Sequence, residues 1–225
     1  MKLNSEHKTS DVLPQAYCQC NVSCSCGQSG EPTSANKKYK TIVIDPPWGG
    51  YGDWRSGSEK ALVKKMHGVH IPLAYKTMSI QEIKNLPIKS LADINCELYV
   101  WTTQKHIPVT YEIIKHWGFK YCTTITWCKK PMGTGQGGVY TPTTEFLIHG
   151  RIGKMPKVKR LDSTWFEHKR QKRHSKKPEF FQDLIETVSD APRLEMFARR
   201  ERAGWDVFGN EVSNSIKLNA GNNYS

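Results

Sequence analysis

The sequence has no long hydrophobic run, and its apolar stretches fall well short of the roughly 18 residues that a membrane-spanning helix needs. Its N-terminal segment, MKLNSEHKTSDVLPQ, lacks the apolar region of a secretory signal. Acidic residues are also few, since 21 Asp and Glu stand against 33 Lys and Arg and leave a formal net charge of +12. We therefore expect a soluble, cytoplasmic protein with a polyanionic partner, for which nucleic acid is the first candidate.

The sequence has an odd number of cysteines, seven, so they cannot all be paired in disulfides. This count argues against a complete disulfide framework. Four of them crowd into one run, C-x-C-x3-C-x-C, made of Cys18, Cys20, Cys24 and Cys26. Thiolates at this spacing can bind zinc, but structural zinc sites more often use C-x2-C pairs. We assign no metal to the protein, and zinc at this cluster stays open as the alternative.

The length of 225 residues suits one globular domain with some excess at the ends. Residues 1–38 are rich in Ser, Gln, Asn, Gly and Pro without any hydrophobic period, which predicts a flexible tail. We expect the folded domain over residues 39–212 and a polar tail over residues 213–225. No internal repeat is present in the sequence.

Apolar, β-branched runs alternate with helical patterns along this domain. Strands are expected at 39–45, 97–103, 120–130, 143–150, 193–199 and 205–210, and helices from Ser79 to Pro87, at 106–118 and from Pro178. A polar loop is expected from Gly49 to about Thr77. This alternation predicts an α/β fold with a mainly parallel sheet and helices on both faces. Such sheets bind ligands beyond the carboxyl ends of their strands, where Asp45, Thr102, Lys129 and Arg199 stand.

Positive charge concentrates between Arg151 and Lys177. This segment holds eleven Lys or Arg and only two acidic residues, Asp162 and Glu167, which gives a local net charge of +9. A solvated loop is one interpretation of such a run. The other is nucleic-acid contact, because basic residues with interleaved aromatics such as Trp165 can track phosphates and stack bases. We favour the second and predict a basic substrate-binding loop over residues 151–175. Its candidate contact residues are Lys169, Arg170, Lys172 and Arg173.

The tetrapeptide Asp45-Pro46-Pro47-Trp48 follows a buried strand and carries the chemistry. The two prolines stiffen the loop, so the Pro46 carbonyl can be held beside the Asp45 carboxylate. Two acceptors next to the aromatic Trp48 fit a planar ring with an exocyclic NH2 group. An isolated Asp-Pro would indicate only a turn, but four specified residues directly after an apolar strand predict a site.

Adenine N6 is such a group, and it is a weak nucleophile because its lone pair is delocalised into the ring. Hydrogen bonds from both N6 hydrogens to Asp45 and to the Pro46 carbonyl would favour a localised lone pair. The electrophile must then be strongly activated, as the sulfonium methyl of S-adenosylmethionine is. Catalysis would consist mainly of positioning and electrostatics, on a base that is flipped out or single-stranded.

The chain resembles the MT-A family of adenine-N6 methyltransferases, named for the seventy-kilodalton subunit of the eukaryotic messenger-RNA N6-adenosine methyltransferase. The motifs that carry the resemblance are DPPW, Y-x-T-M, LYVWTT, WGFKY, TWCKK, HSKKPEFF and LEMFARRERAGWDVFGNE, in that order over residues 39–212. It implies a Rossmann-like methyltransferase fold with permuted motif order. The cofactor strand reads FARRER, so no glycine-rich signature supports the cofactor independently.

The resemblance also implies roles for single residues. Asp45, Pro46, Pro47 and Trp48 would bind and activate the adenine. Lys177, Glu195, Arg199 and Asn210 would bind S-adenosylmethionine. Tyr75 would close the active-site loop over the adenine, and Glu145 would lie on the substrate side. Apart from the resemblance, Trp127 is a candidate for substrate contact because it lies near the site by strand position, although the core is its better interpretation. Each of the residues outside the tetrapeptide also has a structural interpretation.

Three functions stay open at this point. The first is an active methyltransferase acting on DNA, which the compact catalytic core favours as in bacterial and phage members of the family. The second is the same chemistry on RNA. The third is a non-catalytic nucleic-acid-binding subunit, against which the intact DPPW argues. The sequence does not distinguish a monomer from a homodimer or a heteromeric methyltransferase partner.

Overall fold

The computed structural model describes the chain in segments that all belong to one compact unit, Pro32–Ser225. The described residues are 37–49, 63–66, 69–72, 77–130, 140–154, 160–170 and 176–218, with backbone alone at 63–66, 69–72 and 130. The predicted N-terminal tail with its four clustered cysteines therefore lies outside the described residues, apart from positions 37 and 38.

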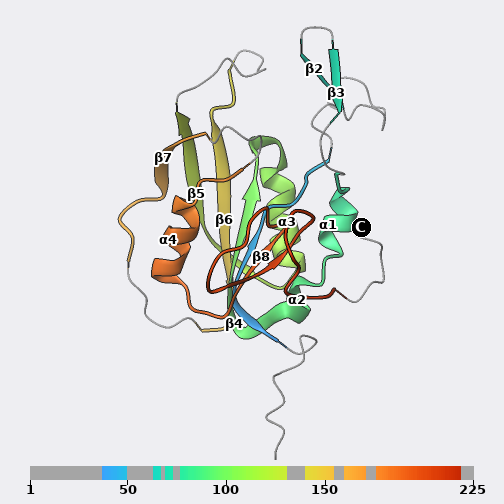
Figure 1. Cartoon of the computed structure of the whole chain (residues 1–225). Helices are drawn as coiled ribbons and strands as arrows, with labels where there is room; N and C mark the ends of the chain where they lie inside the picture. Colours follow the sequence, from blue (N-terminus) through green and yellow to red (C-terminus); the bar gives the residue numbers. More distant parts are fainter. Residues whose placement is uncertain are drawn as a thin grey trace, which may run out of the picture. The chain divides into compact units, whose positions relative to one another are not determined.

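A seven-stranded sheet forms the centre of the domain (Figure 1). Its strands are β1 (Tyr39–Ile44), β4 (Ala92–Thr102), β5 (Lys120–Lys130), β6 (Thr144–Ile152), β7 (Trp165–Lys169), β8 (Arg193–Met196) and β9 (Trp205–Phe208). They lie in the order β7-β5-β6-β4-β1-β8-β9, and only β6 runs antiparallel to its neighbours. The prediction of a mainly parallel sheet is confirmed.

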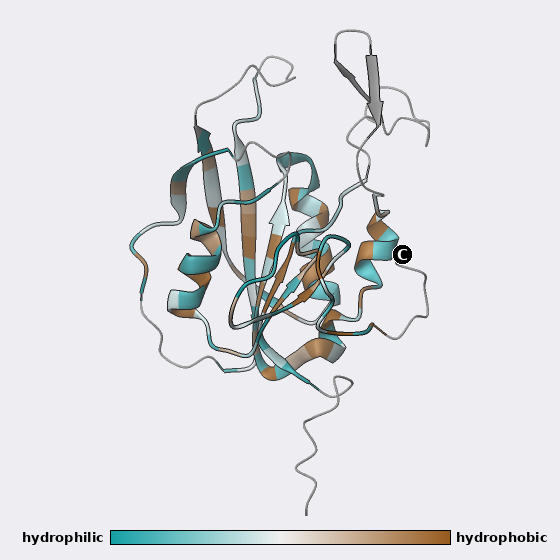
Figure 2. Cartoon of the chain, in the orientation of Figure 1, coloured by the Kyte–Doolittle hydropathy of each residue, from teal (hydrophilic) through white to brown (hydrophobic). Residues whose placement is uncertain are grey.

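Helices cover both faces of this sheet, as the alternation along β1 requires. Ile42 and Ile44 pack toward α1 (Ile80–Lys84), α2 (Ile88–Leu91) and α3 (Ile107–His116), whereas Val43 packs toward α4 (Phe180–Val188). Because successive side chains of a strand point to opposite faces, a strand buried on both sides is apolar throughout. Figure 2 shows apolar residues gathered on these central strands.

The ends of the helices follow local chemistry. Ser79 and Glu82 form the predicted capping box of α1. Gly118 adopts a φ of 87° just after α3, a conformation that glycine reaches without a Cβ clash. Pro87 ends the first helical segment as expected, but α2 begins directly after it at Ile88, and the sequence analysis did not predict that helix. No helix in the described part of the chain is long and apolar enough to cross a membrane.

Three segments differ from the sequence-based expectations. Within the predicted basic loop, residues Trp165–Lys169 form strand β7, because Phe166 and His168 point inward and pack on Phe180. Within the expected polar loop, a separate hairpin joins β2 (Val63–Met66) to β3 (Val69–Pro72). In the predicted C-terminal tail, Ile216 is buried in the core. In β7, exposed residues alternate with inward-facing ones. The high count of charged residues in this segment hid that alternation from the sequence analysis.

Candidate active site

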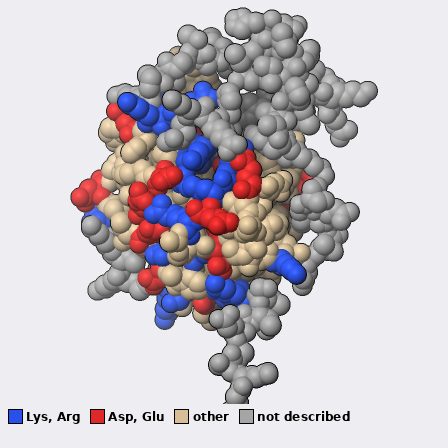
Figure 3. Space-filling model, viewed as in Figure 1, with Lys and Arg blue, Asp and Glu red and all other residues tan. Residues whose placement is uncertain are grey.

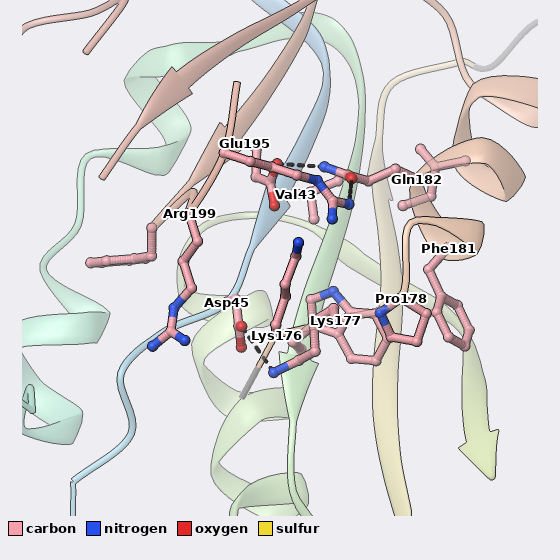
Figure 4. A pocket seen from close by; sticks show the side chains of 13 residues that line it. Val43, Asp45, Lys176, Lys177, Pro178, Phe181, Gln182, Glu195 and Arg199 are labelled. Atoms are coloured by element: carbon pink, nitrogen blue, oxygen red, sulfur yellow. Dashed lines mark hydrogen bonds and ion pairs between the residues drawn. The ribbon is translucent and has the colours of Figure 1, made fainter. Parts of the chain in front are cut away.

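A cleft opens where β1 ends and the chain passes into Asp45 (Figure 4). The residues that line the cleft are Val43, Asp45, Trp101, Lys176, Lys177, Pro178, Phe181, Gln182, Ile185, Glu195, Phe197, Arg199 and Arg200. They come from the carboxyl ends of β1, β4 and β8, from α4 and from the segment before α4. The cleft therefore lies at the edge of the sheet where parallel strands end, as expected for a ligand site.

Lys177 joins two carboxylates at the mouth of this cleft. Its Nζ lies 2.9 Å from Asp45 Oδ2 and 3.2 Å from Glu145 Oε2. Lys129 Nζ lies 2.5 Å from the other oxygen of Glu145. The four groups thus form a continuous chain of alternating charge, and the Lys177 ammonium also stands 5.4 Å above the centre of the Trp101 ring. Residues from β1, β5, β6 and the segment before α4 meet here, although they are far apart in the sequence.

The charges in this chain shift one another's pKa values. Burial raises the pKa of Asp45, and Lys177 opposes that rise without cancelling it. Burial acts in the same direction on Glu145, but Lys177 and Lys129 outweigh it and lower the pKa of Glu145. Burial disfavours the charged form of Lys177, yet Asp45 and Glu145 raise its pKa above the ordinary lysine value. Lys177 is therefore a permanent cation beside Asp45.

The loop after Asp45 is held by its backbone. The Trp48 N–H donates to the Pro46 carbonyl at 2.8 Å, which closes a tight turn and sets the direction of that carbonyl. The Pro47 carbonyl accepts from Met78 N–H at 2.9 Å, and Gly49 N–H donates to the Met78 carbonyl at 3.1 Å. A carbonyl oxygen has two lone pairs, so the Pro46 carbonyl retains the capacity to accept a second hydrogen bond.

Trp48 does not form the aromatic wall that the sequence analysis expected. Its side chain is only 8% exposed and belongs to the core on the α3 side of the sheet. The indole Nε1–H donates to the Trp101 carbonyl at 3.0 Å, and the ring stacks on His106 with centroids 5.0 Å apart. Trp48 anchors the loop. The aromatic residues that line the cleft itself are Trp101, Phe181 and Phe197.

The far part of the cleft holds a polar network around Glu195. Gln182 donates its amide N–H to Glu195 Oε2 and accepts a hydrogen bond from Arg200 through its amide oxygen. Arg200 also contacts Glu179 at 2.8 Å. Burial raises the pKa of Glu195 to about 7, with Arg200 opposing the rise and Asp45 adding to it. Glu195 therefore changes its protonation state close to neutral pH.

A sharp turn after β8 brings Arg199 to the cleft. Phe197 adopts a φ of 62°, in the left-handed region that residues other than glycine seldom occupy. Arg199 lines the cleft beyond it and lies 3.6 Å from Glu211. Asn210, the fourth residue predicted to bind the cofactor, is exposed after β9 and is absent from the cleft lining, although its neighbour Glu211 contacts Arg199.

The residues predicted to bind substrate are distributed unevenly. Glu145 lies in the site, bonded to Lys129 and Lys177. Trp127 is 2% exposed in the core beneath α4 and donates to the His168 carbonyl at 2.9 Å, as its core interpretation expects. Lys169 and Arg170 are exposed at the end of β7. Three predicted residues lie outside the described ones: Tyr75, Lys172 and Arg173.

Sequence reasoning missed Gln182, Arg200 and His106. Gln182 carries a readable signal, since it is a polar residue on the apolar inward face of α4 next to Phe181 and two positions before Leu184. Arg200 and His106 carry none, because nothing in the sequence shows that they reach Gln182 and Trp48. Among the described residues, no group of three or more His, Cys, Asp or Glu is placed to hold a metal ion.

Comparison with known proteins identifies relatives of this chain among methyltransferases. The chain is 30% identical over 201 residues to the type II methyltransferase M.MunI of Mycoplasma sp, covering 83% of this chain and 84% of the relative. It is 28% identical over 200 residues to the N(6)-adenine-specific methyltransferase METTL4 of Mus musculus, with 80% and 38% covered. It is 26% identical over 192 residues to an N(6)-adenosine-methyltransferase MT-A70-like protein of Arabidopsis thaliana, with 81% and 25% covered.

The family model MT-A70 matches residues 39–211, which include the strands of the sheet and the residues of the cleft. That span begins with β1 and ends just beyond β9, at Glu211, the residue that contacts Arg199. The resemblance noted in the sequence is thereby confirmed, and the chain belongs to the MT-A70 family.

Proposed function

We propose that this protein transfers a methyl group from S-adenosylmethionine to N6 of adenine in DNA. The observation that carries the proposal is the Asp45 carboxylate, which lines a cleft at the carboxyl ends of the parallel strands. The Pro46 carbonyl follows it directly and is held in a tight turn by the Trp48 N–H. The family match and the names of the methyltransferase relatives support the reaction class.

The acceptor amine would meet two oxygen atoms of different character. Asp45 accepts one N6 hydrogen as a carboxylate, and the Pro46 carbonyl accepts the other. Asp45 Oδ2 already contacts Lys177, so the amine would share this carboxylate with a cation or use its second oxygen. Two accepted hydrogen bonds localise the N6 lone pair, and the fixed loop needs no reorganisation during the reaction.

The remaining cleft fits S-adenosylmethionine by the chemistry of its groups. Glu195, with a pKa of about 7, can accept hydrogen bonds from ribose hydroxyls. Arg199 supplies donors at the same end, and the Trp101 ring and Asp45 offer a face and a charge that suit a cation. When bound, the cofactor supplies an activated methyl group, and the residues of the cleft orient the amine toward it.

DNA is the proposed polymer because a relative of which this chain covers 84% is named a type II methyltransferase. The chain spans only 24–38% of the plant, mouse, human and fly methyltransferase relatives. A non-catalytic subunit from Arabidopsis thaliana matches 44% of this chain, but the charged cleft around Asp45 favours catalysis here. A cytoplasmic location belongs to the same proposal.

The test is transfer of labelled methyl from S-adenosylmethionine to duplex DNA, single-stranded DNA and RNA, followed by digestion and identification of N6-methyladenine. We expect label on DNA adenine, and a loss of at least about a hundredfold in Asp45→Asn, because that change removes the negative charge and replaces one acceptor oxygen by an NH2 donor. Label on RNA alone would replace the proposed polymer. Cofactor binding without label on any polymer would favour the non-catalytic alternative or a missing partner chain.

A further inference from the structure

His106 lies buried between the end of β4 and the start of α3, where it touches the loop that follows β1. His106 is only 5% exposed. The imidazole stacks on the Trp48 ring with centroids 5.0 Å apart and an angle of 15° between the planes. Its Nε2 lies 3.2 Å from the Gly49 carbonyl oxygen, and its Nδ1 lies 3.0 Å from Thr103 Oγ1. All three contacts are made at once.

These partners determine the tautomer of His106. The Gly49 carbonyl can only accept a hydrogen bond, so Nε2 must carry the proton that is donated to it. Nδ1 of the neutral ring then accepts from the Thr103 hydroxyl. Burial lowers the pKa of His106, with the Gly49 bond opposing, which is consistent with a neutral ring near pH 7. By donating to Nδ1, the Thr103 hydroxyl leaves the ring proton on Nε2, which points toward Gly49.

The side chain of His106 is not needed for the helix that it precedes. His106 is the N-cap residue of α3, yet its side chain makes no capping hydrogen bond there. The first turn of the helix is held instead by the Thr110 hydroxyl, which donates to the His106 carbonyl at 2.7 Å. The imidazole therefore acts on the loop from Asp45 to Gly49 and contributes nothing to the cap of α3.

From these contacts we propose that His106 is a positioning residue that fixes the Pro46 carbonyl for the acceptor amine. The path is short: His106 holds the Trp48 ring and the Gly49 carbonyl, and the Trp48 N–H holds the Pro46 carbonyl at 2.8 Å. Loosening Trp48 frees the carbonyl to turn away while Asp45 remains bonded to Lys177. This inference rests on the proposed function, because it assigns that carbonyl to the acceptor.

The kinetic test compares three substitutions at this position in the full chain. His106→Gln keeps an N–H donor for the Gly49 carbonyl, His106→Phe keeps a ring against Trp48, and His106→Ala keeps neither. We expect kcat to fall at least about tenfold in the Ala and Phe variants and less than about threefold in Gln, since a 1 Å displacement of a reacting group is costly. The Kd for S-adenosylmethionine and the KM for DNA should change less than about twofold. His116→Ala, an exposed histidine on α3, is the matched control.

A second readout needs no activity. The indole Nε1–H resonance of Trp48, assigned by its loss in Trp48→Phe, reports on the bond to the Trp101 carbonyl. We expect it to shift or broaden in His106→Ala and to stay in place in His106→Gln. Unchanged kcat in His106→Ala would overturn the inference. So would an equal decrease of cofactor affinity and of melting temperature in all three variants, because that result would indicate a general loss of structure. If the unaltered protein methylates no polymer, the proposed function fails, and an undisturbed Trp48 resonance in His106→Ala would then reject the positioning role separately.

Discussion

Lys177 is the residue on which the electrostatics of the site depend. Its ammonium pairs with both Asp45 and Glu145, at 2.9 and 3.2 Å, and Lys129 supplies the second positive charge to Glu145. A buried carboxylate that loses its only strong counter-charge either protonates or destabilises the fold. Of the charges around Asp45, Lys177 contributes the largest effect that lowers its pKa. The activity of Asp45 as an ionised acceptor is therefore tied to this one cation.

Replacing Lys177 by methionine tests that dependence. We expect methyl transfer to fall about tenfold or more at pH 8 and the acid limb of the pH–rate profile to move to higher pH. The sign follows because activity needs ionised Asp45, and without Lys177 the pKa of Asp45 rises further. Lys177→Arg, which keeps the charge, should leave the acid limb in place. Profiles of kcat at saturating cofactor measure this, and an unmoved limb in the methionine variant would contradict the assignment.

Glu195 allows a test on stability instead of activity. Its pKa rises from 4.5 to about 7 on folding because of burial, so the folded chain retains a proton that the unfolded chain releases between these values. The free energy of unfolding therefore decreases as pH rises through this window, and the penalty is complete above about pH 7. Glu195→Gln removes the penalty while its amide oxygen still accepts from Gln182. Calorimetry should show the Tm of the variant, relative to the original, rising by a few degrees between pH 5 and pH 8. A difference that is constant with pH would refute the shifted pKa.

At the scale of elements, the two short strands β8 and β9 shape the end of the cleft that Arg199 lines, through the turns that follow them. Phe197 turns the chain with a positive φ, and Ala198 N–H donates to the Phe208 carbonyl at 3.0 Å. Gly209 lies against this turn so closely that a Cβ there would stand 2.2 Å from the Ala198 carbonyl oxygen. Arg199 reaches the cleft because these two backbone segments touch.

Gly209→Ala should therefore be far more damaging than an ordinary glycine substitution. The clash is with backbone atoms, which cannot turn away, so we expect a loss of at least about 3 kcal/mol. For a chain of this length, that lowers Tm by roughly 6–12 °C. Gly204→Ala is the control, since its Cβ would meet nothing within 4 Å and only its φ of 79° opposes the change, at a cost of about 1 kcal/mol. Similar melting temperatures for the two variants would show that the strands separate easily.

At the scale of the whole molecule, ion pairs on the described surface offset part of the positive charge. Figure 3 shows basic and acidic side chains interspersed on the face it views, as expected from ion pairs such as Arg200 with Glu179 and Arg202 with Asp183. Strand β7 is part of the sheet, so removing residues 151–175 would take away a strand and expose the aromatic cluster beneath α4. Single charges are the better probe of nucleic-acid contact.

Neutralising Lys169 and Arg170 together, as Lys169→Gln with Arg170→Gln, should weaken DNA binding at 0.1 M salt. Each lost phosphate contact reduces the slope of log K against log salt by about one. The matched control is Lys115→Gln with Lys120→Gln, two exposed basic residues outside residues 151–175, at the end of α3 and the start of β5. Cofactor affinity should be unchanged in both double variants. Equal effects of the two pairs on DNA affinity would indicate unspecific attraction to net charge.

The sequence by itself determined the architecture and the centre of the site. Buried strands, a capping box at Ser79 and a proline at Pro178 are local signals, and each is read within a few residues. Asp45 at the end of an apolar strand predicted the position of the cleft, because parallel strands end at one edge of a sheet. The family motifs extended this prediction to Lys177, Glu195 and Arg199, all of which line the cleft.

Only the tertiary structure decided which side chains meet. Whether Trp48 faces a ligand or the core depends on the positions of Trp101 and His106, more than fifty residues further along the chain. The same holds for the pairing of Lys177 with Glu145. It also holds for β7, whose inward side is defined by the helix α4 that packs on Phe166. Local sequence patterns set the type of each element, whereas burial, charge pairing and pKa depend on neighbours that the fold brings together from distant segments.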